Sequence, residues 1–213
     1  MYSVLVADDE PAARKHIETI IARKCPGYYV AGSVSNGGEA LKKVRQLQPD
    51  VLITDIRMPV LNGIELVKRI VEEKEDIIIV LVSGYSDFSY AQSAIRLGVS
   101  DYILKPVVPS ELQRMLEGLE ERLKVQYWRN RNLIIRKLCA GDEISEKIID
   151  RYFSEGLYDA AIIRMNGLPC RFSGYGRKEI FSDVNERMLI YGRDEREMLC
   201  ICPHELIEEQ DFP

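Results

Sequence analysis

Four charged residues, Asp8, Asp9, Asp55 and Lys105, each stand at or directly after the end of a short apolar run. If the runs are parallel strands, these side chains gather at their carboxyl edge, where open α/β sheets bind ligands. Carboxylates that lie close together repel one another unless a cation joins them, and an all-oxygen ligand set favours Mg²⁺. A carboxylate can also attack phosphorus and form an aspartyl phosphate. The pattern therefore predicts a phosphoryl site in which Asp55 is the nucleophile and Lys105 binds a phosphate oxygen.

The elements that must position these residues alternate along the first half of the chain. Short runs rich in β-branched residues are typical of strands buried on both faces, and they occupy residues 3–7, 29–34, 51–54, 77–82 and 101–104. Segments with helical spacing of apolar residues lie between and after them, at 11–24, 38–47, 63–73 and 87–97. The alternation predicts the α/β class, a flavodoxin-like (βα)5 domain with a parallel five-stranded sheet.

The stretches around the charged residues resemble the receiver domain of two-component response regulators. The resemblance covers residues 1–120, and its matching stretches are 4–11, 50–63, 82–85 and 101–107. It implies that a partner histidine kinase phosphorylates Asp55. It also implies a bound Mg²⁺, held by Asp9, Asp55 and the backbone carbonyl of Arg57, with Asp8 contributing through water.

The same resemblance assigns roles to residues on the later strands. Ser83 and Lys105 would contact the phosphoryl group, and Tyr102 would be the aromatic residue that changes position on phosphorylation. Arg57 and Tyr85 would lie at the rim of the pocket and tune dephosphorylation, although decoration of the surface is an equal alternative. Phosphorylation is expected to reshape the face formed by the fourth helix, the fifth strand and the fifth helix.

Residues 83–107 are similar to the YesN/AraC-type subfamily, whose output is a pair of helix-turn-helix motifs. No such module is visible in this chain, so control of transcription is expected through a DNA-binding output domain outside it. Two alternatives stay open. One is an enzyme controlled by the receiver, and the other is a phosphorelay intermediate that passes the phosphoryl group on.

A long helix is expected over residues 109–140. A heptad-like spacing of 4, 3, 4, 3, 4 and 3 runs through Leu112, Leu116, Leu119, Leu123, Gln126, Asn130 and Leu133. The early leucines must partly serve the receiver core, whereas the later part of the helix could pair with a second copy. The spacing therefore indicates a homodimer that forms on phosphorylation, with Leu116, Leu119, Leu123 and Asn130 as the seam residues. The alternative is a linker helix that packs on the receiver and on the module that follows.

Residues 155–213 are expected to form a small α+β module. The segment from Gly192 to Arg196 lies between two strand-like runs and resembles the hairpin of GGDEF-type cyclase domains, with Asp194 and Glu195 in the place of the signature acids. Arg193 replaces the second glycine, and the first strand lacks the metal-binding aspartate. The module is therefore interpreted as a degenerate, non-catalytic one, and the chain as a signalling protein rather than an enzyme.

Composition limits the remaining choices. The net charge is −5, and both parts of the chain are acidic, with 14 Lys and Arg against 17 Asp and Glu in residues 1–120 and 15 against 17 in residues 121–213. Neither part has the basic surface that a DNA-binding domain needs. No apolar run reaches membrane-spanning length, and five cysteines without a C-x-x-C pair fit a reducing compartment. A cytoplasmic protein without membrane contact is expected.

Overall fold

The computed structural model describes residues 1–73, 77–84, 96–153, 158–164, 188–191 and 197–204. The chain divides into two units, Met1–Lys124 and Val125–Pro213. The long helix α5, Pro109–Ala140, contributes residues to both.

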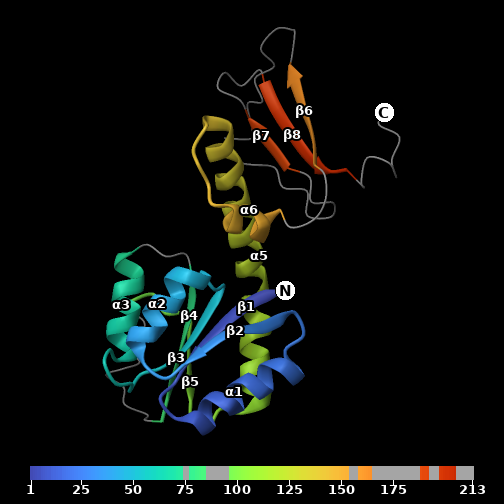
Figure 1. The fold of residues 1–213 in the computed structure, drawn as a ribbon. Coiled ribbons are helices and arrows are strands. Elements are labelled where there is room, and N and C mark those ends of the chain that lie inside the picture. The colour runs from blue at the N-terminus through green and yellow to red at the C-terminus, as the bar shows by residue number, and fades with distance from the viewer. Residues whose placement is uncertain (74–76, 85–95, 154–157, 165–187, 192–196, 205–213) are drawn as a thin grey trace. The chain divides into compact units, whose positions relative to one another are not determined.

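The first unit is built on a parallel sheet of five strands in the order β2-β1-β3-β4-β5 (Figure 1). The strands are β1 Tyr2–Ala7, β2 Tyr28–Val34, β3 Val51–Asp55, β4 Ile78–Ser83 and β5 Asp101–Leu104. β1, β3 and β4 are buried almost throughout, which explains their nearly continuous apolar sequences. The predicted flavodoxin-like (βα)5 fold is confirmed.

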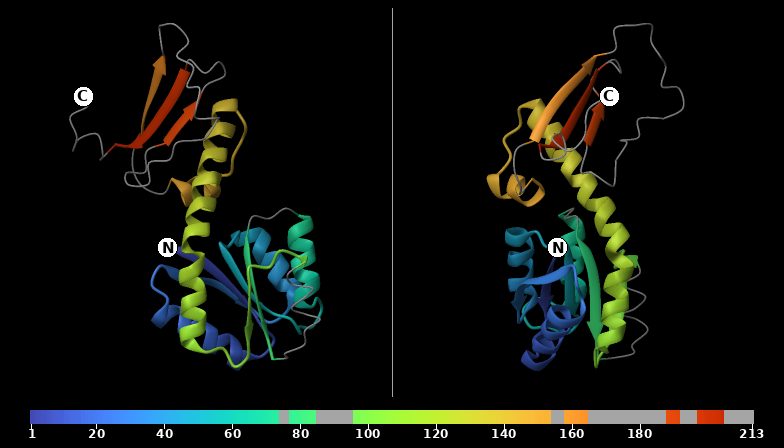
Figure 2. Two further views of the ribbon diagram at one scale, coloured as in Figure 1. Left: turned by 180° about the vertical axis from the view of Figure 1, so that it is seen from behind. Right: turned by 90° about the vertical axis from the view of Figure 1, so that its right-hand side faces the viewer.

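Helices cover both faces of this sheet, as Figures 1 and 2 show. The described helices are α1 Pro11–Lys24, α2 Gly37–Leu47, α3 Gly63–Glu72 and the first part of α5. Alternate residues of β1 point to opposite faces: Val4 and Val6 pack with α1 and α5, whereas Leu5 and Ala7 pack with α2 and α3. The helix predicted at 87–97 lies almost entirely outside the described residues.

Local sequence explains where the helices begin. Pro11 occupies the first turn of α1, a position that needs no backbone N–H. Asn36 and Asn62 cap α2 and α3, because their side-chain oxygens accept hydrogen bonds from the backbone N–H three residues later, at 2.8 and 2.9 Å. The loop between β3 and α3 is thereby fixed at its far end.

The second unit contains a short helix and an antiparallel sheet. The helix α6, Glu146–Tyr152, was not predicted from the sequence. The sheet has the order β6-β8-β7, with β6 at Tyr158–Arg164, β7 at Met188–Tyr191 and β8 at Glu197–Pro203. The expected hairpin signature at residues 192–196 lies outside the described residues. Among the described helices, none combines the length and the apolar character that crossing a bilayer would require.

The position of α5 corrects the predicted dimer seam. Leu116, Leu119 and Leu123 are at most 5% exposed and lie in the core between the sheet, α1 and α5. These leucines cannot face a second copy of the chain while the receiver is folded, so the seam prediction is wrong for them. Asn130 donates a hydrogen bond to the hydroxyl of Tyr152 at 3.2 Å, within the second unit.

Candidate functional site

Strand register brings the predicted site residues to one edge of the sheet. Ala7 pairs with Thr54, so the residues that follow, Asp8 and Asp55, are neighbours at the carboxyl ends of β1 and β3. On the other side of β3, the backbone N–H of Lys105 donates to the carbonyl of Ser83 at 2.7 Å. The Ser83 side chain is buried at the end of β4, in the strand next to β3.

The ammonium of Lys105 lies among three carboxylates. Its Nζ is 3.1 Å from Oδ2 of Asp55 and 3.1 Å from Oε1 of Glu10, and both contacts have hydrogen-bond geometry. Oδ2 of Asp8 lies 2.9 Å from the same Nζ as an ion pair whose angles fall outside hydrogen-bond geometry. One lysine thus joins β1, β3 and the start of α1 across the top of the sheet.

The pKa values of Asp55 and Lys105 are both raised, for different reasons. Burial is the largest cause that raises the pKa of Asp55; the Lys105 ammonium lowers it and Asp8 raises it, and the net change is upward. Burial lowers the pKa of Lys105, but contacts with Asp8, Asp55 and Glu10 outweigh this effect and raise it. Lys105 is therefore a permanent cation at neutral pH, held beside a carboxylate that is incompletely solvated.

The backbone around Asp55 is held by close packing. Oδ1 of Asp55 accepts a hydrogen bond from the N–H of Ile56 at 2.7 Å, and the N–H of Gly63 donates to the Ile56 carbonyl at 2.8 Å. A Cβ atom at Gly63 would lie 2.2 Å from the carbonyl oxygen of Asp55. Only glycine permits this approach, so the first residue of α3 fixes the peptide that carries Asp55.

Four carboxylates are close enough together to bind one cation. Asp8, Asp9, Glu10 and Asp55 each offer an oxygen, and these atoms lie within 4.8 Å of one another. Asp8 and Asp55 are buried, whereas Asp9 and Glu10 are exposed and open to water. A partly hydrated, oxygen-only site of this kind fits Mg²⁺. Arg57 lies two residues after Asp55 with an exposed side chain.

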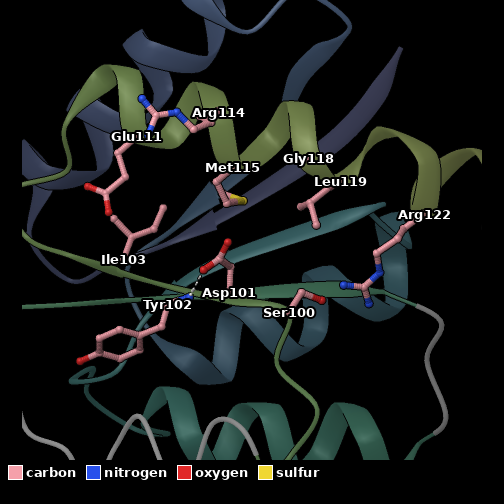
Figure 3. Close-up of a pocket in the computed structure, with 10 residues that line it drawn as sticks. All are labelled: Ser100, Asp101, Tyr102, Ile103, Glu111, Arg114, Met115, Gly118, Leu119 and Arg122. Carbon is pink, nitrogen blue, oxygen red and sulfur yellow. Dashed lines mark hydrogen bonds between the residues drawn. The ribbon is translucent and has the colours of Figure 1, made fainter.

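Tyr102 lies on β5, away from this cluster. Its half-buried ring packs with the cluster of apolar residues on the α2 and α3 face of the sheet. Figure 3 shows the ring of Tyr102 and the carboxylate of Asp101 on opposite sides of the strand. Tyr85, the other aromatic residue predicted for the site, lies outside the described residues.

Sequence reasoning missed two contributors to the site. Glu10 was recognised only as part of a matching stretch, because its contact with Lys105 joins residues 95 positions apart. Gly63 was seen as part of a motif, but its close approach to Asp55 depends on the packing of α3 against β3. The Asn-Gly pair before the apolar face of α3 was the only local signal for it.

Fold and site together define a receiver-type signalling domain, and comparison with known proteins agrees. The family description "response regulator receiver domain" matches residues 4–117. The chain therefore belongs to the response-regulator receiver family, and its receiver is of the kind found in YesN-type regulators.

Relatives and solved structures define the extent of this similarity. The transcriptional regulatory protein YesN of Bacillus subtilis is 35% identical over 126 residues, which are 59% of this chain and 34% of YesN. The chemotaxis protein CheY of Thermotoga maritima is 36% identical over 118 residues, 55% of this chain and 94% of CheY. The REC domain of AraT, a response regulator from Geobacillus stearothermophilus, has 36% identity and a TM-score of 0.55, covering 59% of this chain and 97% of that one.

The chain spans only part of its longer relatives. It covers 34% of YesN and 46% of a response regulatory protein of Vibrio cholerae. The matched family region ends at residue 117, so the second unit lies beyond it.

Proposed function

We propose that Asp55 accepts a phosphoryl group from a sensor histidine kinase and that this reaction switches the receiver. The observation that carries the proposal is the position of Lys105 Nζ, 3.1 Å from Oδ2 of Asp55 beside a group of carboxylates. An oxygen of Asp55 forms the new bond to phosphorus as the bond from phosphorus to the kinase histidine nitrogen breaks. That nitrogen leaves with the bonding electron pair and takes a proton from solvent.

The residues of this chain have separate tasks in that reaction. Asp9, Asp55 and the Arg57 carbonyl would hold Mg²⁺, with Asp8 acting through water. The bound ion would supply charge neutralisation between the carboxylate and the incoming phosphoryl group. Lys105 supplies a positive charge to the site in both the unphosphorylated and the phosphorylated state.

The switch follows from the charge that phosphorylation adds. An aspartyl phosphate brings about −1.5 to −2 charges and three acceptor oxygens, by analogy with other phosphorylated side chains. Ser83 and Lys105 move to meet these oxygens, and Tyr102 occupies the space that Ser83 leaves. Reversing the population of two states takes about 5 kcal/mol of differential binding, which a few charge-assisted contacts of about 1.5–3 kcal/mol each supply.

The face that responds includes a groove between β5 and α5 (Figure 3). Its volume is about 460 Å³, and the buried side chains of Ile103, Met115 and Leu119 line it. The lining also contains two acids and two arginines, Asp101, Glu111, Arg114 and Arg122, together with Ser100, Tyr102 and Gly118. A balanced, partly apolar surface suits a two-fold interface, in which each copy presents the same residues. We therefore assign the phosphorylation-dependent homodimer to this groove instead of the leucine seam.

The consequence for the cell lies in the rest of the protein. Similarity to YesN supports control of transcription through a DNA-binding domain outside this chain. On this proposal the chain is a cytoplasmic phosphoprotein that receives a signal, and it is not an enzyme in its own right.

Treatment with acetyl phosphate and Mg²⁺, followed by intact-mass and peptide mass measurement, tests the proposal. One phosphoryl group on Asp55 is expected in the native chain and none in Asp55→Asn. Asp142→Asn makes the same chemical change at an exposed aspartate of the second unit and should leave labelling intact. Labelling of another residue, or equal labelling of Asp55→Asn, would contradict it. Size measurement on the same samples reports the expected dimer.

A further inference from the structure

Glu10 makes a contact that neither its place in the fold nor the metal site requires. It is the N-cap residue of α1, but its side chain forms no capping hydrogen bond. Its backbone N–H donates to Oδ1 of Asp8 at 2.9 Å. The carboxylate extends instead over the site, where Oε1 accepts a hydrogen bond from Lys105 Nζ at 3.1 Å.

This contact occupies one of the N–H donors of the Lys105 ammonium, a second donates to Asp55, and Asp8 lies beside Nζ as an ion pair. A lysine has three N–H donors, and the described residues place three carboxylates within 3.1 Å of Nζ: Asp8, Glu10 and Asp55. The Lys105 side chain is only 15% exposed, so water has little access to it. A phosphoryl oxygen that adds to the site must therefore take a position that a carboxylate already holds.

The three carboxylates differ in how easily they can leave. The side chains of Asp8 and Asp55 are 1% and 7% exposed, and each accepts a hydrogen bond from a nearby backbone N–H. Glu10 is 63% exposed, so water replaces Lys105 at small cost when the glutamate turns away. Glu10 is thus the partner that Lys105 can exchange.

We infer that Glu10 competes with the phosphoryl group on Asp55 for Lys105 and so favours the unphosphorylated state. This inference rests on the proposed function, because it requires Asp55 to be the acceptor. The carboxylate of Glu10 acts in two ways with the same sign. It occupies a donor of Lys105, and it adds a negative charge beside a group that itself carries negative charge. Glu10 is a positioning residue, since it acts through Lys105.

The test compares Glu10→Gln with the native chain, using beryllofluoride as the probe of the phosphorylated state. Glutamine keeps the length of the side chain and removes its charge. At saturating Mg²⁺, titration followed by NMR or calorimetry should show beryllofluoride binding about two- to fivefold tighter in Glu10→Gln, the range expected for loss of one exposed ion pair. Glu18→Gln, on the same helix and paired with Lys15 at 3.2 Å, is the matched control and should bind like the native chain.

A titration with Mg²⁺ alone separates this role from a direct role in metal binding. The inference expects the affinity of Glu10→Gln for Mg²⁺ to fall less than about threefold, the loss of one exposed charge near the ion. If Mg²⁺ binding falls by more, while beryllofluoride binding at saturating Mg²⁺ is unchanged, Glu10 is a metal ligand and the inference is overturned. Equal or weaker beryllofluoride binding by Glu10→Gln also overturns it and leaves the proposed function in place. If the native chain, like Asp55→Asn, does not bind beryllofluoride, both the inference about Glu10 and the proposed function are contradicted.

Discussion

The two halves of α5 bury different kinds of residues. Up to Leu123 the buried positions are leucines and one methionine, which pack with the receiver sheet and α1. Beyond that residue the described buried positions are Trp128, Arg131, Asn132, Ile134 and Ile135, two of them polar. One helix therefore belongs to an apolar core in the first unit and to a core that also contains buried polar side chains in the second.

Arg131 shows what this difference means physically. Its side chain is fully buried, and its guanidinium carbon lies 4.8–5.5 Å from the ring centroids of Trp128, Phe153 and Tyr158. It also donates a hydrogen bond to the Tyr158 hydroxyl at 3.0 Å. In the first unit, by contrast, the buried charges Asp8 and Asp55 lie at the edge of the sheet, beside the site. In the second unit the charged guanidinium of Arg131 packs directly against aromatic rings.

Leu116→Ala should give the largest effect. It removes a fully buried side chain from the first half of α5, and a loss of about 4 kcal/mol in the free energy of unfolding is expected. Denaturation followed by circular dichroism, with hydrogen exchange of the β1 and β3 amides, measures it. Leu133 lies in the second half of α5 and is 50% exposed, so Leu133→Ala should lower the free energy of unfolding by less than about 0.5 kcal/mol. Similar losses in the two variants would contradict the difference between the halves.

Arg131→Ala should have the second largest effect, a loss of about 3 kcal/mol in the free energy of unfolding, because it removes ring contacts and a hydrogen bond from a buried site. Trp128 is the single tryptophan of the chain, so its fluorescence reports the transition of the second unit. Arg131→Met keeps the volume without the charge and should be close to neutral. An Arg131→Met variant as unstable as Arg131→Ala would show that the charge, and not the packing, stabilises this core.

Tyr28→Phe should have a smaller effect on the receiver. The Tyr28 hydroxyl is buried and donates to the carbonyl of Leu116 at 2.7 Å, so its removal should cost about 1 kcal/mol. The matched variant in the second half of α5 is Tyr127→Phe. In the native chain the Tyr127 hydroxyl is partly buried and donates to the carbonyl of Tyr152 at 3.2 Å. This variant should cost less, as thermal unfolding would report. The opposite order would mean that the second half is the more tightly bonded one.

Gly118→Ala should give the smallest change, and with the opposite sign. Gly118 is exposed within α5, and a Cβ atom there would meet nothing within 4 Å. Replacing a helical glycine by alanine should therefore stabilise the chain by about 0.5–1 kcal/mol. Gly63→Ala is the contrast, since its Cβ would collide with the Asp55 carbonyl. A destabilised Gly118→Ala variant, measured by the same unfolding assay, would contradict this prediction.

These contrasts also explain what the sequence could predict. The strands of the receiver were found because each is a short apolar run, and the acids were placed correctly because parallel strands end at one edge. The spacing of the leucines in α5 predicted the helix correctly, but it also predicted contact with a second copy, whereas Leu116, Leu119 and Leu123 pack in the core of their own receiver. A spacing of 4 and 3 is the same whether a helix packs on its own sheet or on a second helix, and only the fold decides between them.

The parts that were missed lack a local signal. Most of the surroundings of Arg131 are distant in the sequence, because the aromatic rings that it contacts include Phe153 and Tyr158, which lie 22 and 27 positions further along. The contact between Glu10 and Lys105 likewise joins distant segments. The helix α6 is only seven residues long, too short to show a clear apolar period.

The close approach of Gly63 to Asp55 has a consequence for protein engineering. The segment from the acceptor to the start of α3 is held at both ends, by a strand at one end and at the other by a glycine without room for a side chain. Chimeric receivers that exchange helices should therefore keep residues 55–63 together and join the parental sequences outside them. We expect a crossover within this segment to displace the acceptor even when every residue of the phosphoryl site is retained.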